Sequence, residues 1–493
     1  MTKRHKPVTL LATILAFGFL MRILFAFYYS GGWRPDEIFQ NLEPAHWYLT
    51  GHGVITWEWQ AKIRNWIMPG VAIVIWKATS LMGLGLPPSA VRVFFSVLSV
   101  SIIAAFSVLG KLRYGRTGLM ICGITAIFWP DLLIGAARTG GEFQAGNTFA
   151  LAICLALIGK FQQENAKKYY ALYIFSAFFI GVTFDLRFQL VPACGLAILW
   201  IGYWIKNWTY RFCFLISFLI PVFFLGILDK ITLGGYFISV YNNFYLNAYK
   251  GVADSYGVEH VYYYISFFIK DWKISTPIVF YFFFRGFRQY ALPATLAVFI
   301  IFFHSAINHK EVSFIYAALP LIILVSSLSF SSMIENCSKE TLFKYGLAVF
   351  VFCQLNRTYV VDQMRKSSSI TDLMVKVSGY NDMCGLALMT DYYTWGASGG
   401  YTLVRKKDVP LYFYPFEFNI DGENKHYNYV ISYRDYDPHN LSKKNITCAD
   451  QYCLFKISDN CLGKPDYKQF ENMVGFVEQP DIKKKYNEIW KIW

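Results

Sequence analysis

The sequence has few charged residues. Lysine, arginine, aspartate and glutamate make up 16% of its 493 residues, whereas soluble domains carry about 25%. Hydrophobic residues make up 55% and aromatic residues 19%, and the mean hydropathy is +0.34. This composition disfavours a soluble globular domain and indicates a membrane protein.

The sequence also lacks a recognisable secretory cleavage site. No small-residue site follows the first apolar run, residues 7–29, and the basic residues 3–6 (KRHK) precede it. A signal peptide would have a shorter apolar core. We therefore expect an uncleaved membrane anchor.

Apolar runs recur along the first 355 residues, and several reach the roughly 20 residues that a helix needs to cross a bilayer. The runs are 8–29, 68–84, 91–109, 118–136, 146–160, 169–184, 189–205, 210–228, 262–284, 291–304, 312–330 and 342–355. No internal repeat is evident. The sequence therefore predicts an all-α polytopic membrane protein with about 11 membrane helices.

The formal net charge of +14 has two interpretations. It would suit nucleic acid or another acidic partner, or it reflects the excess of lysine and arginine in cytoplasmic loops. The basic residues form short clusters between apolar runs, at 3–6, 111–116, 160–168, 206–211 and 285–288. This pattern favours the second interpretation, so no nucleic-acid partner is expected. The first run then crosses outward, and residues 30–67 form the first extracytoplasmic loop.

The runs 68–84 and 91–109 cannot both cross fully, because the basic segment 111–116 would then lie outside. Either 68–84 lies at the interface or dips into the membrane and returns, or the two runs share one crossing around Pro87 and Pro88. With this parity, the long loop 229–261 and the polar tail from 356 onward also lie outside.

The ten cysteines are scattered, and four of them lie in the polar C-terminal third. Cys384, Cys448, Cys453 and Cys461 would suit one or two disulfides in an oxidising compartment, and their spacing does not indicate a zinc site. Strand-like alternation such as YNYVISYR predicts a small mixed α/β domain. We therefore expect a transmembrane catalytic domain at 1–355 and an extracytoplasmic domain at 356–493.

Four clusters of ionisable residues fall on the same external face under this topology. They are Asp36 with Glu37, Arg138 with Thr139 and Glu142, Asp185 with Arg187, and His309 with Lys310 and Glu311. One such residue is more often an interfacial anchor, but ionisable residues at membrane depth usually mark a functional site. Four clusters on one side predict a shared cleft.

The residue types in these clusters suggest a reaction at a phosphate group. Cationic side chains stabilise phosphate, and a carboxylate near a hydroxyl can take its proton. Aromatic rings between them would stack on sugar faces. Trp33, Trp47 and Trp66 equally suit the aromatic belt at the membrane surface, whereas the sequence Trp57-Glu58-Trp59 favours the site.

The segment RPDEIFQNLEPAHWYLTGHGVITWEWQAKIRN, residues 34–65, resembles the first lumenal loop of glycosyltransferase family 22. These enzymes are lipid-phosphate-mannose-dependent mannosyltransferases with the GT-C fold. The matching residues are Pro35, Asp36, Glu37, Phe39, Gln40, Glu43, Ala45, His46, Thr56, Trp57, Glu58, Trp59, Ile63, Arg64 and Pro69. The nearest branch is the type that adds the third mannose of GPI anchors.

Three further segments resemble the same family in order. They are ARTGGEFQ (137–144), the stretch 228–264 with Asp229, Gly235, Asn247, Ser255, Tyr256, Gly257 and Tyr264, and HKEVSFIYAALPL (309–321). The chain departs from the family pattern at Arg34, Asn65, Glu259 and Ser313. The residues after 355 resemble no family that we can name.

The resemblance implies transfer of mannose from a polyprenyl- or dolichyl-phosphate donor to a hydroxyl of a glycan or glycolipid, with inversion at the anomeric carbon. Asp36 is the expected general base, and Glu37 is the alternative base or orients Asp36. The candidates for the donor phosphate are Arg64, Arg138, Arg187, His309 and Lys310. The candidates for sugar and acceptor binding are Trp57, Glu58, Trp59, His46 and Tyr256. No metal or other cofactor is expected, because the donor lacks a diphosphate.

Other interpretations stay open at this point. Asp36 and Glu37 could act only as a helix cap, and Arg64 and Lys310 could only extend toward the membrane surface. A lipid or glycolipid transporter or flippase would explain buried charges, although it would favour charges at the midplane and repeated, broken helices. A transferase of another lipid-linked sugar and an inactive scaffold of the same fold are further alternatives.

The host membrane is expected to be the endoplasmic reticulum in a eukaryote or the inner membrane in a bacterium, with the site on the lumenal or periplasmic face.

Overall fold

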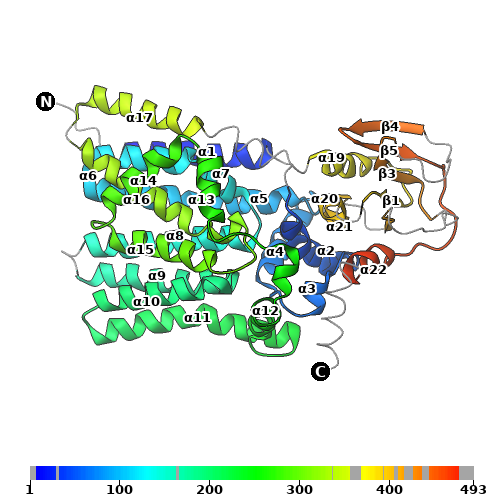
Figure 1. The fold of residues 1–493 in the computed structure, drawn as a ribbon, viewed down its shortest axis with the longest axis horizontal. Helices are drawn as coiled ribbons and strands as arrows, with labels where there is room; N and C mark the ends of the chain where they lie inside the picture. Colours follow the sequence, from blue (N-terminus) through cyan, green and yellow to red (C-terminus); the bar gives the residue numbers. More distant parts are fainter. Residues whose placement is uncertain are drawn as a thin grey trace. The chain divides into compact units, whose positions relative to one another are not determined.

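The computed structural model describes residues 7–28, 33–162, 166–335, 337–355, 368–391, 394–404, 409–415, 426–435 and 444–476 (Figure 1). The chain divides into two compact units, which are described separately. The first contains Met1–Tyr28, Arg92–Ile238 and Ala253–Asp362, and the second contains Tyr29–Val91, Ser239–Val252 and Gln363–Trp493. The domain boundary expected after residue 355 falls beside residues 356–367, which lie outside the described residues.

The first unit is a bundle of apolar helices. They are α1 (Pro7–Tyr28), α6 (Val100–Phe128), α7 (Pro130–Ala137), α8 (Gly141–Phe161), α9 (Ala166–Leu186), α10 (Val191–Trp204), α11 (Trp208–Leu233), α13 (Tyr263–Phe267), α14 (Ser275–Gly286), α15 (Ala291–Ser305), α16 (Ala318–Met333) and α17 (Lys339–Gln354), while α5 (Pro88–Leu98) leads into α6. Five helical stretches among the described residues are long and apolar enough to cross a membrane: Thr9–Phe27, Pro88–Phe128, Gly141–Phe161, Tyr169–Leu186 and Trp208–Leu233. The predicted helical membrane class is confirmed.

The helix α6 is a hairpin. Its backbone leaves the helical conformation at Tyr114 and Gly115, and Gly115 has a φ of 56°, a value that glycine adopts without steric cost. Past the turn, Gly118 lies against Gly110, so closely that a Cβ on either residue would overlap the backbone of the other. The basic segment 111–116 occupies this turn, between the two apolar runs that the sequence predicted.

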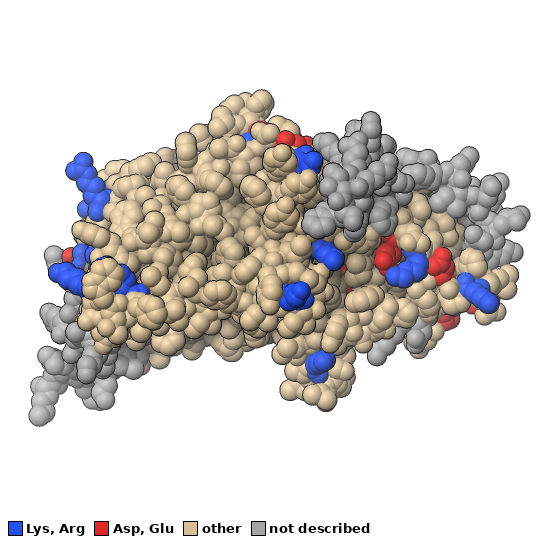
Figure 2. All heavy atoms as spheres, turned by 90° about the horizontal axis from the view of Figure 1, so that it is seen from below, with Lys and Arg blue, Asp and Glu red and all other residues tan. Residues whose placement is uncertain are grey.

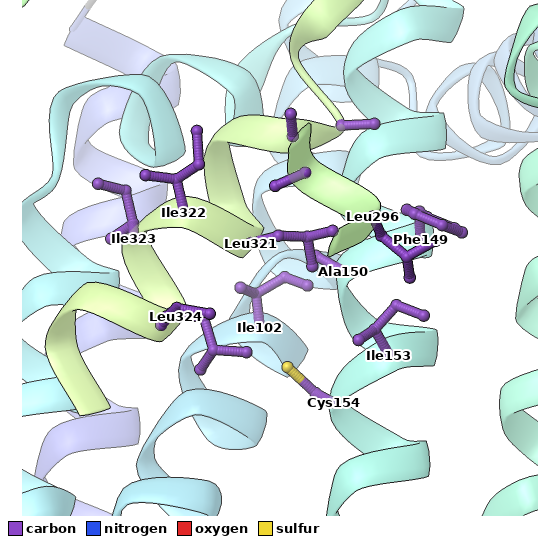
Figure 3. Close-up of a cluster of buried hydrophobic side chains, with 14 of the residues drawn as sticks. Ile102, Phe149, Ala150, Ile153, Cys154, Leu296, Leu321, Ile322, Ile323 and Leu324 are labelled. Carbon is purple, nitrogen blue, oxygen red and sulfur yellow. The ribbon is translucent and has the colours of Figure 1, made fainter. Parts of the chain in front are cut away.

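The core of this unit lies where α6, α8, α15 and α16 meet. Figure 3 shows side chains from these four helices gathered in one apolar cluster, among them Ile102 of α6, Phe149 and Ile153 of α8, Leu296 of α15 and Leu321 of α16. These residues follow the helical periodicity that brings apolar side chains onto shared faces. The cluster fixes the helices on which the charged residues lie.

The outer surface of the first unit is also apolar. On α11, Phe212, Ile220, Phe223, Phe224 and Ile231 are all exposed. On the face drawn in Figure 2, the left part is mostly uncharged, and lysine and arginine gather at its left end. Exposed apolar surface of this extent requires an apolar environment, which a bilayer supplies.

Several predicted runs are not single helices, which corrects the sequence prediction, and two of them are broken beside the same carboxylate. The run 118–136 breaks at Trp129, which is extended ahead of Pro130. The run 262–284 is divided into α13, the π-helix η5 (Phe268–Trp272) and α14, with Lys273 at a φ of 47°. The indoles of Trp129 and Trp272 both donate to Asp131 Oδ2 at 2.9 Å. Both helix breaks therefore lie beside a tryptophan that donates a hydrogen bond to the buried carboxylate of Asp131.

The second unit joins the first external loop to distant segments. The loop forms the π-helix η1 (Glu37–Leu42), α2 (Glu43–Thr50) and α3 (Trp57–Gln60), and the apolar helix α4 (Ile67–Leu81) follows it. The second long loop supplies α12 (Ile238–Asn243) and η3 (Phe244–Tyr249). The side chains of Asn242 and Asn243 donate to the carbonyls of Ala61 and Ile63 at 3.0 and 3.1 Å. The apolar helix α4 has 15 residues, and the idea that 68–84 does not cross fully stays a prediction.

The C-terminal part of the second unit is a mixed α/β fold, as predicted. Its helices are α19 (Ser368–Val377), α20 (Trp395–Ser398), α21 (Gly400–Val404) and α22 (Gln469–Phe476), and its strands are β1 (Leu386–Met389), β2 (Leu411–Phe413), β3 (Tyr429–Tyr433), β4 (Lys444–Ala449) and β5 (Tyr452–Lys456). The sheet order is β2-β1-β3-β5-β4, and β1 pairs parallel with both neighbours. Two disulfides, Cys384–Cys461 and Cys448–Cys453, confirm the expectation from the cysteines.

The contact between Gly110 and Gly118 makes a stability prediction. We expect Gly118→Ala to lower the unfolding free energy by about 1–3 kcal/mol, because its methyl group meets backbone that has no room to move. Gly195→Ala in α10, where a Cβ meets open space, is the control. Thermal unfolding in detergent compares the two, and equal melting temperatures would contradict the close packing of the hairpin.

Candidate active site

The two acidic residues at the start of the segment 34–65, Asp36 and Glu37, have different environments. Glu37 is buried, and its carboxylate accepts a hydrogen bond from the backbone N–H of Arg34 at 3.1 Å. It thereby satisfies an amide at the beginning of the helix. Asp36 is half-buried and makes no side-chain capping hydrogen bond. The capping role that the sequence left open for both residues therefore belongs to Glu37.

The WEW segment is packed into the second unit. Glu58 accepts a hydrogen bond from Arg64 Nη2 at 2.5 Å. Trp57 is buried in an apolar cluster, and Trp59 is buried with its ring 5.0 Å from that of Trp66. This burial favours a packing role for both indoles. Their contact with a sugar, and a contact of Arg64 with phosphate, stay predictions.

Glu43 is the most deeply buried carboxylate of this loop. Its Oε2 accepts the backbone N–H of Val54 at 2.8 Å, and its Oε1 accepts the N–H and the hydroxyl of Thr402 at 2.6 and 2.5 Å. Burial raises the pKa of the Glu43 carboxyl, against the effect of the nearby His46 and of these hydrogen bonds. Sequence reasoning matched Glu43 to the family motif but assigned it no function, because its partner Thr402 lies 359 residues away.

His46 is also committed to the internal structure of the loop. It is buried, and its Nδ1 lies 2.6 Å from the carbonyl oxygen of His52. The ring is stacked 6.3 Å from that of Tyr401. A role of His46 in acceptor binding stays a prediction.

In the first unit, three of the four predicted charged clusters come together. A small cavity of about 10 Å³, with room for about one water molecule, is lined by Glu142, Arg187, Gln189, Leu190, His304, Ser313, Phe314 and Ala317. Arg187 Nη2 donates to Glu142 Oε1 at 2.8 Å, and Ser313 Oγ donates to Glu311 Oε2 at 2.9 Å. The segments FDLRFQ, ARTGGEFQ and HKEVSF therefore share one cavity, whose polar lining includes a cation.

Arg138 lies where α7 ends and α8 approaches. Its side chain is buried, and its carbonyl oxygen accepts Gln144 Nε2 at 2.5 Å. This hydrogen bond fixes the turn between the two helices. A contact of Arg138 with the donor phosphate stays a prediction.

The His309–Glu311 segment holds a neighbouring loop. His309 Nδ1 lies 2.8 Å from the Gly257 carbonyl, and Lys310 Nζ donates to the Glu259 carbonyl at 2.7 Å. The exposed ring of Tyr256 lies 6.3 Å from that of His309. Because Lys310 is buried and bonded in this way, the structure favours an anchoring function for it, and the phosphate and acceptor contacts of these residues stay predictions.

Sequence reasoning missed two further buried polar residues of the first unit. Asp131 accepts the two indole N–H groups described above, and its signal was the polar WPD sequence inside an apolar run. His304 lines the cavity beside Arg187, and its Nδ1 lies 2.9 Å from the Ile300 carbonyl. A histidine within a membrane helix was the signal that would have found it.

The loop motifs, the helical bundle and the cavity agree with one family of enzymes. The model of the Alg9-like mannosyltransferase family matches residues 13–387. The chain belongs to this family. It is therefore a membrane glycosyltransferase, and membership in a family of transferases disfavours the transporter and flippase alternative. The family match ends in β1, ahead of most of the C-terminal sheet.

Curated relatives carry related names. GPI mannosyltransferase 3 of Yarrowia lipolytica is 24% identical over 379 residues, which cover 72% of this chain and 69% of that protein. Human GPI alpha-1,2-mannosyltransferase 3 is 21% identical over 340 residues, covering 65% of this chain and 58% of the relative. The matched region is therefore less than two thirds of the human protein's length.

Solved structures confirm the GT-C fold that the sequence predicted. ArnT from Cupriavidus metallidurans in the apo state has a TM-score of 0.60 at 11% identity, covering 91% of this chain and 98% of ArnT. The structure of ArnT bound to undecaprenyl phosphate has a TM-score of 0.58 at 10% identity, with 93% and 99% covered. Identity this low supports the fold alone.

The pair formed by His309 and Glu311 makes the stability of the turn at residues 305–311 depend on pH. A hydrogen bond from His309 to Glu311 raises the pKa of His309. Although burial disfavours the Glu311 carboxylate, hydrogen bonds from His309 and Ser313 lower its pKa to about 2. The histidine therefore contributes stability below its unfolded pKa of about 6.5, and this contribution is lost as the pH rises through the folded value.

We expect the loop 253–260 to open more readily at about pH 8.5 than at about pH 6, by about two- to fivefold for a partly exposed pair. Hydrogen exchange followed by mass spectrometry, corrected for the intrinsic pH dependence of amides, measures this opening. Glu311→Gln is expected to remove the difference. The same difference in wild type and Glu311→Gln would show that another group titrates.

Proposed function

We propose that this enzyme transfers mannose from a polyprenyl- or dolichyl-phosphate donor to a hydroxyl group of a glycan or glycolipid. Three observations support the proposal: the family match, the names of the relatives, and the undecaprenyl phosphate bound to the similarly folded ArnT. Another lipid-phosphate-linked sugar is the alternative donor. A GPI-like acceptor agrees with the names of the relatives.

The observation that carries the catalytic proposal is the contrast between Asp36 and Glu37. Glu37 is buried and bonded to the backbone of Arg34, which suits a residue that orients its neighbour. Asp36 is half-buried and so stays partly accessible to an acceptor hydroxyl. We therefore assign the general base to Asp36 and a supporting function to Glu37.

The proposed reaction is a single displacement. The acceptor hydroxyl attacks the anomeric carbon and gives its proton to the Asp36 carboxylate while the bond from that carbon to the phosphate oxygen breaks. The electron pair of that bond leaves with the lipid phosphate, so the configuration at carbon inverts, as in inverting glycosidases with water as acceptor. The leaving phosphate needs positive charge rather than a proton, and we assign this to Arg187 and Arg138.

The location of the reaction follows from the second unit. Its two disulfides suit an oxidising compartment, and the same unit contains the loop with Asp36. This supports a catalytic loop on the lumenal or periplasmic face, in agreement with the basic clusters of the sequence.

The base assignment predicts that Asp36→Asn lowers transfer by at least about 100-fold, the usual contribution of a general base. The assay follows radiolabelled mannose from undecaprenyl- and dolichyl-phosphate-mannose into lipids of membranes that lack this protein. The exposed Asp459, 89% accessible, gives the control Asp459→Asn, which is expected to keep full activity. Undiminished transfer by folded Asp36→Asn enzyme would exclude Asp36 as the base.

The phosphate assignment predicts a different kinetic change at Arg187. Arg187→Lys keeps the positive charge but loses the planar, forked group that holds a phosphate at two oxygens. We expect kcat/KM for the lipid-phosphate donor to fall about tenfold or more. The control is Arg211→Lys, because Arg211 bonds the Ile205 carbonyl and lies over the ring of Trp208, and it does not line the cavity that contains Arg187. Equal kcat/KM in wild type and Arg187→Lys would contradict the assignment.

A further inference from the structure

The segment Trp395–Val404, formed by α20 and α21, lies outside the family match and packs on the helix that follows Asp36. At the beginning of that helix, a Cβ on Gly396 would lie 3.1 Å from Cγ of Pro35, the residue directly before Asp36. The ring of Trp395 meets that of Phe39 edge-on at 4.6 Å. The C-terminal part of the chain therefore contacts the immediate neighbourhood of the proposed base.

The same segment binds the helix a second time, near its middle. Thr402 donates both its backbone N–H and its hydroxyl to the buried carboxylate of Glu43, at 2.6 and 2.5 Å. Hydrogen bonds to a charged group are about twice as strong as those between neutral groups. Pro35 and Glu43 are therefore held by one continuous segment of chain.

Gly400 allows this close approach. Its φ is +54°, and a Cβ at this position would lie 2.7 Å from Cδ of Glu43. A larger residue would be strained in this conformation and would push the carboxylate away. The approach of α21 to Glu43 thus depends on a glycine that the family model does not cover.

The segment is itself fixed to the C-terminal fold. The hydroxyl of Tyr401 accepts the backbone N–H of Leu411 in β2 at 3.1 Å, and the ring of Tyr401 lies 6.3 and 6.4 Å from those of His46 and His52. Thr371 of α19 donates to the Ala397 carbonyl at 3.1 Å. A displacement of the external helix would therefore have to displace the sheet or break these bonds.

The external helix needs such support. It consists of the six-residue π-helix η1 followed by the eight-residue α2, and isolated helices shorter than about 12–15 residues are marginal in water. π-helical turns are rare and are frequent at functional sites. Held only by its own hydrogen bonds, this helix would not fix the carboxylate of Asp36 for proton transfer.

We propose that the C-terminal segment Trp395–Val404 positions the base-bearing helix, and that Thr402 and Gly400 are positioning residues of the transferase. The proposal rests on the proposed function, in which Asp36 is the base. It gives the C-terminal domain a direct part in catalysis: the rate of proton transfer at Asp36 depends on Thr402 even though Thr402 acts through Glu43 and does not touch the acceptor.

The experiment compares Thr402→Val, which keeps shape and backbone N–H but loses the hydroxyl, with Thr402→Ser, which keeps the hydroxyl. The matched control is Thr447→Val in β4, where the hydroxyl accepts Lys376 Nζ. Each full-length enzyme is assayed with undecaprenyl- and dolichyl-phosphate-mannose and membranes lacking the protein. Thermal unfolding and hydrogen exchange of residues 35–50 are measured on the same preparations.

We expect Thr402→Val to lower kcat about tenfold with little change in KM for the donor, because orientation of the base is lost while binding is kept. Exchange in 35–50 becomes faster, and Thr402→Ser recovers both properties. Thr447→Val behaves as wild type. If Thr402→Val does not fold, Trp395→Leu, at the other contact, is expected to show the same loss of kcat and the same faster exchange.

Unchanged kcat and unchanged exchange in Thr402→Val would overturn the proposal, as would a lower melting temperature with full kcat per folded enzyme. A wild-type kcat in Trp395→Leu would also overturn the proposal. These results test the positioning contact and can be distinguished from a failure of the proposed function. Full transfer by Asp36→Asn removes the base assignment, whereas slow, Thr402-dependent exchange of 35–50 reports on the positioning contact alone.

Discussion

The carboxylate of Glu43 is the point on which the second unit depends. A buried carboxylate is costly unless several donors surround it, and Glu43 obtains them from Val54 on one side and Thr402 on the other. Two stretches that are far apart in the chain must therefore fold together before either is complete. This requirement explains why the first external loop clusters with the C-terminal sheet rather than with the membrane helices that flank it in sequence.

The same constraint organises the charged residues of the first unit. Arg187 is paired with Glu142 at 2.8 Å, and Lys310 is bonded to the Glu259 carbonyl at 2.7 Å. A cation held by one partner still attracts an anion, whereas one whose donors are used by carbonyl groups mainly fixes the backbone. The structure thus separates two functions among residues that looked equivalent in sequence. Arg187 lines a cavity, while Lys310 holds a loop.

The sequence predicted most of the helices because apolar length alone defines a membrane-crossing segment. Hydropathy did not reveal the breaks at Trp129 and Lys273, because a hydropathy profile does not register the hydrogen bonds that accompany them: a local one from Trp129 to Asp131, and one from Trp272, which is distant in the chain. The candidate active site was likewise predicted only in part from the sequence. The motif identified Asp36 and Glu37, but only the structure separates the buried Glu37 from the half-buried Asp36. For Trp57 and Trp59, the sequence suggested rings that stack on a sugar; the structure shows that both are largely buried, and their contact with a sugar stays a prediction.

The family match, residues 13–387, covers nearly all of the helical unit and also the loop segments of the second unit. The packing of the helical unit is set by apolar surfaces that many sequences can supply. The segment Trp395–Val404 lies beyond that match, and its contact with Glu43 depends on a glycine at positive φ and on a hydroxyl within hydrogen-bonding distance. A contact that specific is hard to replace by general hydrophobic packing, because loss of one donor leaves a buried carboxylate short of a partner. The C-terminal domain can therefore diverge widely in sequence only if it keeps, or exchanges for another donor, its contact with the helix that carries Asp36.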